Sequence, residues 1–195
     1  MALDFDGVDD KVDHGDINAV DGVTLLTVAF WLFYDTQGAS DGFYTKGTGF
    51  GFTTMNDGAT QMVTRDSNAL KTRTATGTLT LGVWNYWAIV LNTAGASADA
   101  RVKIFKDGTK LVLTEIAAHA NPLPSNATAV STMMDDTGAI FADGKMALLK
   151  VWTAELTEAE AFQEMNSYRP ARTVNLVLWS PYDDGASARD YSGSG

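Results

Sequence analysis

Leu25–Tyr34, with the sequence LLTVAFWLFY, is an unbroken run of apolar, β-branched and aromatic residues. The run contains neither Gly nor Pro and is rich in residues that favour extended backbone, so it predicts a β-strand. Side chains alternate across a strand, and Trp31 and Phe33 therefore share one face. Phe30 and Leu32 share the other. Because both faces are apolar, we predict that this strand lies centrally in a sheet and is covered on both sides.

A second stretch, Val83–Asn92, repeats the pattern. Trp84 and Tyr86 alternate along it with Trp87 and Ile89, so this segment also predicts a strand with two apolar faces. We expect loops, another segment of the chain or another subunit to cover the second face of both strands.

Most of the remaining chain is predicted to form short strands joined by turns. Gly, Asn and Asp bound a series of β-prone segments, as in a meander of hairpins. These segments are residues 2–5, 11–14, 42–46, 49–55, 60–65, 69–74, 101–105, 110–115, 127–134, 145–152 and 176–179. One helix is predicted near residues 157–167, because Thr157 and Glu160 have the spacing of a capping box and Pro170 follows.

Length and composition fit a single all-β domain spanning residues 1–195. Of its 195 residues, 45% are hydrophobic and 19% charged, and 18 glycines provide turns. The formal net charge of −10 argues against nucleic acid or an anionic membrane as a partner. No apolar run is long enough to span a bilayer, and the first residues lack the basic start and apolar core of a signal peptide.

The sequence carries no pattern typical of an enzyme. It has no cysteine and no Gly-x-Ser-x-Gly motif, and its two histidines, His14 and His119, lie far apart in the chain. A glycoside hydrolase needs two carboxylates flanking the scissile bond. Four of the five glutamates lie around the predicted helix, where helix capping explains Glu158 and Glu160. We therefore predict no enzymatic activity and keep a glycoside hydrolase as the least favoured alternative.

Aspartates in turns are the candidate metal ligands. Asp-rich and Gly-rich turns offer carboxylate and carbonyl oxygens, the hard donors that calcium prefers. One structural calcium ion is the only cofactor that we predict. The candidate ligands are Asp6, Asp143, Asp183 and Asp190, and Asp9 and Asp10 share the turn of Asp6. The alternative is that these carboxylates accept hydrogen bonds from their own turns.

Aromatic residues in or beside turns are the candidate ligand-binding residues, because an aromatic ring can stack on a sugar ring. They are Tyr44, Phe50 and Tyr86. Most of the tryptophans lie within apolar strands and are interpreted as core. These are Trp31, Trp87, Trp152 and Trp179.

Six stretches along the chain form an ordered set. They are ALDFDGVDDKV (residues 2–12), TVAFWL (27–32), WNYWAIV (84–90), VKIFKDG (102–108), FADGK with the strand that follows it (141–152) and LTEAE (156–160). Together they resemble the laminin G-like and pentraxin-like jelly rolls of the concanavalin A-like lectin/glucanase superfamily. The resemblance implies an all-β fold, an antiparallel jelly-roll β-sandwich with one short helix.

Two features depart from that family. Its calcium-binding members often carry an acidic residue near the third position after the glycine that corresponds to Gly144, whereas residues 146–149 are all apolar. In addition, residues 176–195 resemble a strand and turn that usually precede the Phe-Asp-Gly strand, yet here they come last. We interpret this order as a circular permutation, or as a strand donated to a neighbour. The start of another copy is the alternative.

The resemblance alone does not determine the function, because this sandwich serves lectins, adhesion modules, enzymes and virion components. Our leading hypothesis is a non-enzymatic, lectin-like module on a surface. We predict a phage virion or bacterial surface component that binds glycan or a partner protein by its loop rim, with the protein located on a virion or an extracellular surface. Both apolar strands favour a homo-oligomer or larger assembly. The alternative is a purely structural decoration or oligomerisation subunit that binds no sugar.

Overall fold

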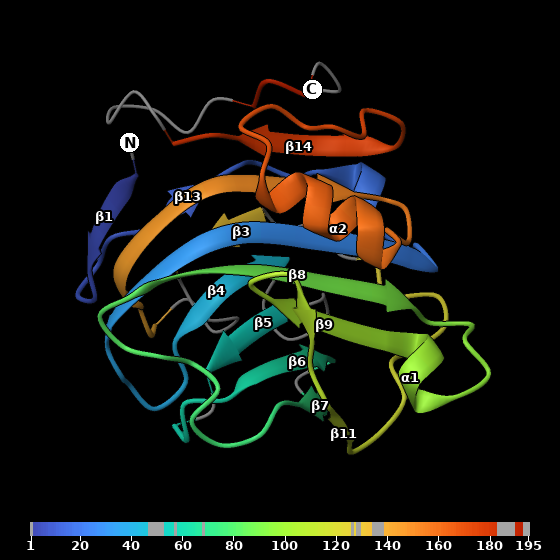
Figure 1. Cartoon of the computed structure of the whole chain (residues 1–195), viewed down its shortest axis with the longest axis horizontal. Coiled ribbons are helices and arrows are strands. Elements are labelled where there is room, and N and C mark those ends of the chain that lie inside the picture. Colours follow the sequence, from blue (N-terminus) through green and yellow to red (C-terminus); the bar gives the residue numbers. More distant parts are fainter. Residues whose placement is uncertain are drawn as a thin grey trace.

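The chain folds as an antiparallel β-sandwich of the jelly-roll type (Figure 1). The computed structural model describes residues 2–46, 53–56, 58–67, 69–125, 127, 130–133, 139–182 and 190–192. Every pairing between named strands in this part of the chain is antiparallel, as the meander of short segments predicts. The fold class predicted from the sequence is confirmed.

In the described part of the chain, two seven-stranded sheets make up the sandwich. Sheet A has the order β1 (Leu3–Asp6), β13 (Asp143–Trp152), β3 (Leu25–Thr36), β8 (Trp84–Asn92), β9 (Val102–Lys106) and β10 (Thr109–Lys110), and β14 (Leu176–Ser180) also pairs with β13. Sheet B has the order β11 (Thr114–Glu115), β7 (Ala69–Arg73), β6 (Met62–Asp66), β5 (Thr53–Asn56), β4 (Gly42–Lys46), β12 (Val130–Thr132) and β2 (Val12–Asp13).

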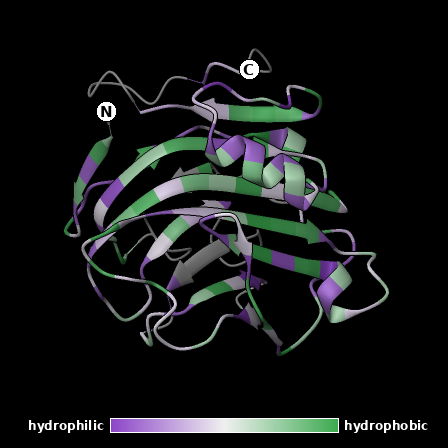
Figure 2. Cartoon of the chain, viewed as in Figure 1, coloured by the Kyte–Doolittle hydropathy of each residue, from purple (hydrophilic) through white to green (hydrophobic). Residues whose placement is uncertain are grey.

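The strand predicted as central, β3, lies between β13 and β8 in sheet A. Its inner face packs into the main core between the sheets, where Phe30 is fully buried and Tyr34 is only 1% exposed. Hydrophobic residues predominate along β14 and much of β3 and β8 in Figure 2. Burial of both faces of β3 explains why its sequence lacks the polar alternation of a strand with one wet face.

Helix α2 (Glu158–Met165) covers part of the outer face of sheet A. It begins at the predicted capping box, in which the Thr157 hydroxyl accepts from the Glu160 amide and the Glu160 carboxylate accepts from the Thr157 amide. Ala161 of α2 packs with Ala29 of β3 and with β8 in a second apolar cluster. The sequence left open whether a loop, another segment or another subunit covers this face. In the structure, helix α2 of the same chain covers this part of it.

Two short helical segments were not expected from the sequence. They are the four-residue helix α1 (Ala98–Arg101), capped by Ser97, and the 3-10 turn η1 (Asn18–Val20). The helix predicted near residues 157–167 is present as α2, and these two segments are additional to it. One turn of helix is too short to show an apolar periodicity. None of the helices in the described ranges is long and apolar enough to cross a membrane.

The first and last strands lie end to end along one edge of β13. Leu3 of β1 pairs with Met146, and Ser180 of β14 pairs with Leu149. Between these two pairs the strand bulges at Leu148, which has a positive φ of 54° and donates its amide to the Pro181 carbonyl. Together β14 and β1 act as one divided edge strand, and the C-terminal strand belongs to the sheet of its own chain.

Two strand predictions changed in the structure. Residues 110–115 divide into β10 and β11, because the chain leaves sheet A at Lys110 and enters sheet B at Thr114. Val112, in between, is 91% exposed. Within residues 127–134, the described part forms the three-residue strand β12. Part of the predicted segment 49–55 lies outside the described residues.

Candidate functional site

The outer face of sheet A is divided into two halves by helix α2. Across β13, β3 and β8, the half beneath α2 contains Lys150, Ala29 and Ala88, which pair with one another in register, and next to them Trp152, Thr27 and Val90. We call these six residues the covered half. The alanines leave room for a helix to approach the sheet closely, and all six residues are buried.

A buried ion pair fixes α2 over the covered half. Lys150 Nζ donates to Glu164 Oε2 at 2.7 Å and to the Ser167 carbonyl at 2.7 Å. Both side chains of the pair are at most 1% exposed. The other carboxylate oxygen of Glu164 accepts from the Arg172 amide at 2.8 Å. These bonds satisfy both charges, as burial requires.

The neighbouring half of the same face is lined with aromatic residues instead of a helix. It contains the cross-strand pairs Trp31–Tyr86 and Phe33–Trp84, with Ala147 and Lys145 beside them on β13. We call these six residues the open half. A cavity of about 450 Å³ lies here, lined by Ala2, Trp31, Trp84, Ala147, Leu148 and Tyr168. This volume lies within the usual range for small-molecule pockets.

Ring-to-ring contacts hold the aromatic residues of the cavity in place. The ring centroids of Trp31 and Tyr86 are 5.7 Å apart, and those of Phe33 and Trp84 are also 5.7 Å apart. Both pairs are tilted by nearly 60°, a geometry that aromatic quadrupoles favour. Trp84 remains 39% exposed. The cavity therefore presents indole rings whose orientation is set before any ligand arrives.

The cavity wall continues into a second group of aromatic residues. Tyr168, which follows α2 and is 49% exposed, meets the Trp179 ring edge-on with centroids 6.2 Å apart. Trp179 in turn contacts Tyr191, which is 47% exposed. Tyr168 thus connects the open half with the C-terminal strand β14.

Neither Tyr44 nor Tyr86, which were predicted to bind a ligand, lines the cavity. Tyr44 is 1% exposed in the main core, and Tyr86 belongs to the open half but is only 2% exposed. Burial raises the pKa of both hydroxyls, and neither ring presents a face on which a sugar could stack. Phe50 lies outside the described residues. The aromatic residues that line the cavity were assigned to the core or were not selected from the sequence.

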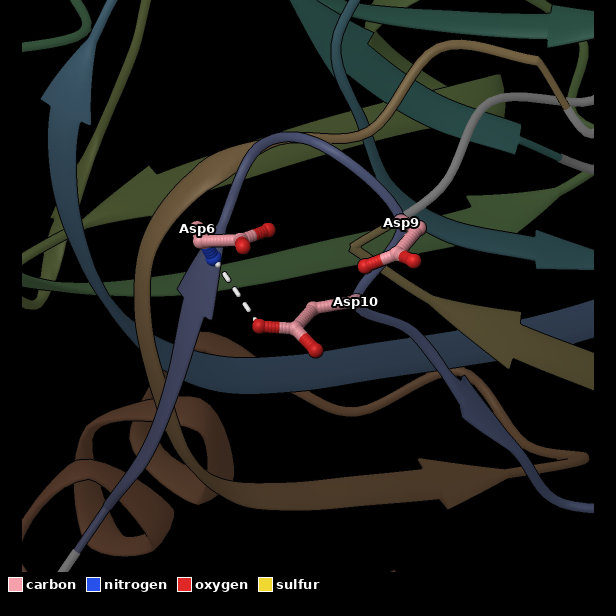
Figure 3. A group of neighbouring side chains, drawn as sticks. All are labelled: Asp6, Asp9 and Asp10. Carbon is pink, nitrogen blue, oxygen red and sulfur yellow. Dashed lines mark hydrogen bonds between the residues drawn. The ribbon is translucent and has the colours of Figure 1, made fainter.

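Three aspartates of the first turn come together where β1 ends (Figure 3). Carboxylate oxygens of Asp6, Asp9 and Asp10 lie within 4.8 Å of one another, and all three residues are exposed. Their own turn also uses them, because Asp10 accepts from the Asp6 amide at 3.1 Å and Asp6 accepts from the Val8 amide at 2.9 Å. This donor set suits calcium and leaves further carboxylate lone pairs available.

The other predicted metal ligands do not all join this group. Asp143 pairs with Asp6 across β13 and β1, and both line a small cavity of about 210 Å³. Asp190 caps its own turn, accepting from the Trp179 amide at 3.0 Å and from the Ser192 amide at 2.8 Å. Asp183 lies outside the described residues.

The glutamates that a glycoside hydrolase would need have structural partners. Glu164 pairs with Lys150, Glu160 with Arg172, Glu155 with Lys103 and Glu115 with Arg101. Glu158 and Glu160 both lie in the first turn of α2, as predicted. None of the five glutamates lines the aromatic cavity.

A hydroxyl, an imidazole and a carboxylate form a chain that the sequence did not reveal. His119 contacts Thr64 Oγ1 through Nε2 at 2.9 Å and Asp66 Oδ2 through Nδ1 at 2.7 Å. The order is that of a catalytic triad, but Thr64 is fully buried and His119 is 5% exposed. No substrate can reach this hydroxyl. The Asp66 carboxylate, whose pKa the hydrogen bond from His119 helps to lower, also pairs with Lys71 and ties a long loop to sheet B.

Comparison with known proteins supports the same fold. Residues 6–161 match the family model described as "Concanavalin A-like lectin/glucanases superfamily". No curated protein sequence matches the chain.

Three solved structures share the architecture at low sequence identity. A putative carbohydrate-binding protein from Bacteroides ovatus has a TM-score of 0.76 and 15% identity, with 99% of this chain aligned to 56% of that one. A heptameric pentraxin from Limulus polyphemus has a TM-score of 0.63 and 14% identity, covering 88% and 83% of the two chains. The CBM40 module of a Ruminococcus gnavus sialidase, bound to α2,3-sialyllactose, has a TM-score of 0.59 and 13% identity, covering 81% and 95%.

Proposed function

Because the chain belongs to the concanavalin A-like lectin/glucanase superfamily, we propose that it is a non-catalytic, lectin-like module that binds glycan in the aromatic cavity. The observation that carries the proposal is the placement of Trp31 and Trp84 side by side in a cavity on the outer face of sheet A. The less polar face of a sugar ring packs well on an indole, which is why such rings are suited to glycan binding. The carbohydrate-binding relatives support the same function.

The paired glutamates support a binding function without catalysis. General acid and base catalysis would require two carboxylates at the ligand, and no carboxylate of the described residues lines the aromatic cavity. The buried His119 chain supplies no alternative nucleophile, because Thr64 is inaccessible. The glycosidase alternative therefore finds no support among the described residues.

A glycan array followed by calorimetry tests this function. For any glycan that binds, we expect Trp84→Ala and Tyr168→Ala each to lower the affinity by about tenfold or more, because each removes a ring from the cavity wall. Phe162→Ala is the control, since Phe162 is 53% exposed but does not line the cavity. Binding that survives both cavity substitutions unchanged would refute the proposed site.

We propose one structural calcium ion at Asp6, Asp9 and Asp10. The gathering of three carboxylates in one turn supports this position, and calcium would contribute charge neutralisation and rigidity there. Asp143 lies across the strand pair from Asp6 and would border the ion.

We also propose that the module works at a surface, on a phage virion or a bacterial cell, as part of a homo-oligomer or larger assembly. The heptameric pentraxin relative supports assembly as a property of this fold. Light scattering on the whole chain, combined with the glycan array, separates the alternatives. A stable oligomer that binds no glycan would favour a purely structural subunit over the lectin-like module.

A further inference from the structure

We infer that the aromatic cavity selects uncharged sugars and disfavours sialylated, sulfated or other acidic glycans. This inference rests on the proposed function, since it names the ligand class of the same site. It follows from the charges around the cavity and from the way in which its rings are held.

Among the residues that the structure describes, no charged side chain lines the cavity. The six described lining residues are three aromatic residues, two alanines and one leucine. An acidic sugar would have to bring its carboxylate or sulfate against this apolar wall. Removing an ionised group from water without a paired cation is strongly unfavourable, whereas the carbon-bound face of a neutral sugar ring loses little on contact with an indole.

The nearest lysine is already neutralised. Lys145 Nζ lies 5.8 Å from the centre of the Phe33 ring, at the edge of the open half. It donates to Asp4 at 2.8 Å and lies 3.9 Å from Asp35. The hydrogen bond to Asp4 raises the pKa of Lys145, so the lysine stays charged, but two carboxylates face it. This group of three is net negative and repels an anion at short range.

Other charges near the cavity do not change this balance. Asp107 accepts from the Tyr86 amide at 2.8 Å, which adds another carboxylate beside the open half. Arg169 follows Tyr168 and is exposed, but its side chain does not line the cavity. The whole chain carries a formal charge of −10. Its long-range field therefore also disfavours anionic ligands, more strongly at low salt.

The two indoles occupy diagonal positions on neighbouring strands. Trp31 of β3 lies opposite Tyr86, and Trp84 of β8 lies opposite Phe33. Diagonal neighbours in an antiparallel pair are roughly 7–8 Å apart, a distance that large aromatic side chains bridge. Because each indole is fixed by its own partner ring, the cavity offers two preset stacking surfaces. Such a surface recognises the shape and apolar face of a sugar, and binding to it does not depend on a charged group of the ligand.

The experiment uses matched glycan pairs that differ only by a terminal sialic acid or a sulfate. We expect the neutral member of each pair to bind at least about tenfold more tightly, with quenching of tryptophan fluorescence and little change between 50 and 500 mM salt. Arg169→Gln serves as the charge variant and should change the affinity for the neutral member by less than about twofold. Trp84→Ala should weaken it by about tenfold or more.

Three outcomes would contradict the inference. A preference for the acidic member overturns the inference alone and leaves glycan binding in place. Loss of binding in Arg169→Gln, with the fold retained by circular dichroism, also overturns the inference alone. Failure of the unmodified chain to bind any member of any pair overturns the proposed function, and the inference with it.

Discussion

The covered and open halves of sheet A share the same three strands but end in different surroundings. In the covered half, Ala29 and Ala88 leave space that α2 fills. In the open half, Trp31 and Trp84 extend above the sheet, and a cavity takes the place of the helix. The comparison shows that a strand with two apolar faces need not be buried along its whole length. Large rings can cover their own part of a sheet and still leave surface for a ligand.

Replacing one tryptophan in each half is the most direct test of this difference. Trp152, fully buried under α2, donates its indole N–H to the Arg172 carbonyl at 2.7 Å. We expect Trp152→Ala to lower the free energy of unfolding by roughly 3–5 kcal/mol, because it leaves a cavity and an unpaired carbonyl. Trp84→Ala, at a 39% exposed position, should cost well under half as much. Urea denaturation followed by circular dichroism measures both. Equal losses would mean that the two halves are equally part of the core.

The ion pair beneath α2 gives the next largest effect. Glu164→Ala should lower the free energy of unfolding by roughly 3 kcal/mol, because it leaves the Lys150 ammonium buried without its partner. Burial already lowers the pKa of Lys150, and Glu164 opposes this effect. Without Glu164, the pKa of the lysine should fall further, so that it loses its proton more easily. Glu158→Ala, on the exposed side of the same helix, is the control. The double variant Lys150→Met/Glu164→Leu should recover much of the loss, and an unrecovered double variant would argue against uncompensated charge as the cause.

Acid should loosen the C-terminal border of the covered half. Tyr182, just after β14, contacts His14 Nε2 at 2.9 Å and Thr132 of sheet B at 3.0 Å. Burial lowers the pKa of His14 from 6.5 to about 4. The unfolded chain therefore binds a proton between these two values while the folded chain does not. The free energy of unfolding should have its full value above pH 6.5 and fall by roughly 2–3 kcal/mol as the pH drops to about 4.

The variant His14→Gln isolates this effect in the same titration. It cannot take up the proton, so its free energy of unfolding should be nearly flat across that window. A slope equal to that of the unmodified chain would assign the acid sensitivity to other groups, such as the carboxylates that titrate at lower pH.

Calcium should act at the opposite border, where β1 flanks the open half. At a free calcium concentration ten times the dissociation constant, stabilisation is about 1.4 kcal/mol, so the thermal midpoint should rise by a few degrees and fall back on adding a chelator. Asp9→Asn with Asp10→Asn should abolish the shift, whereas Asp190→Asn should retain it, because Asp190 caps a separate turn. A thermal midpoint of the unmodified chain that does not change with calcium would argue against the proposed calcium site.

The sequence predicted the sandwich because its decisive signals are local. The two apolar faces of Leu25–Tyr34 predicted a central strand, and the spacing of Thr157 and Glu160 predicted the start of a helix. The division of residues 110–115 between two sheets could not be predicted, since each short piece remains β-prone whichever sheet it joins. Pairing at that point depends on distant strands.

The site was harder to predict than the fold, for a physical reason. When both faces of a strand are apolar, alternation shows which residues share a face but not which face is covered. Tyr86 and Trp84 share the outer face of β8, yet only Trp84 is exposed, because Tyr86 lies in the apolar cluster that includes Ala161 of α2. Where α2 stops decides which rings remain accessible. Tyr168, just beyond that helix, carried no signal of its own in the sequence.

The divided edge strand has a mechanical consequence. Tension on the two ends of the chain reaches β13 at neighbouring positions, at Leu3 of β1 and at Ser180 of β14. At the C-terminal side, the contacts of Asp190 and Tyr191 with Trp179 and those of Tyr182 with His14 and Thr132 must open first. Each strand is then peeled from one end, so the applied force acts on its hydrogen bonds one after another and not on all of them together. We expect single-molecule pulling to release both terminal strands at low force and the rest of the sandwich at a higher one. The module would yield first beside its aromatic cavity, where Ala2 and Leu148 line the wall.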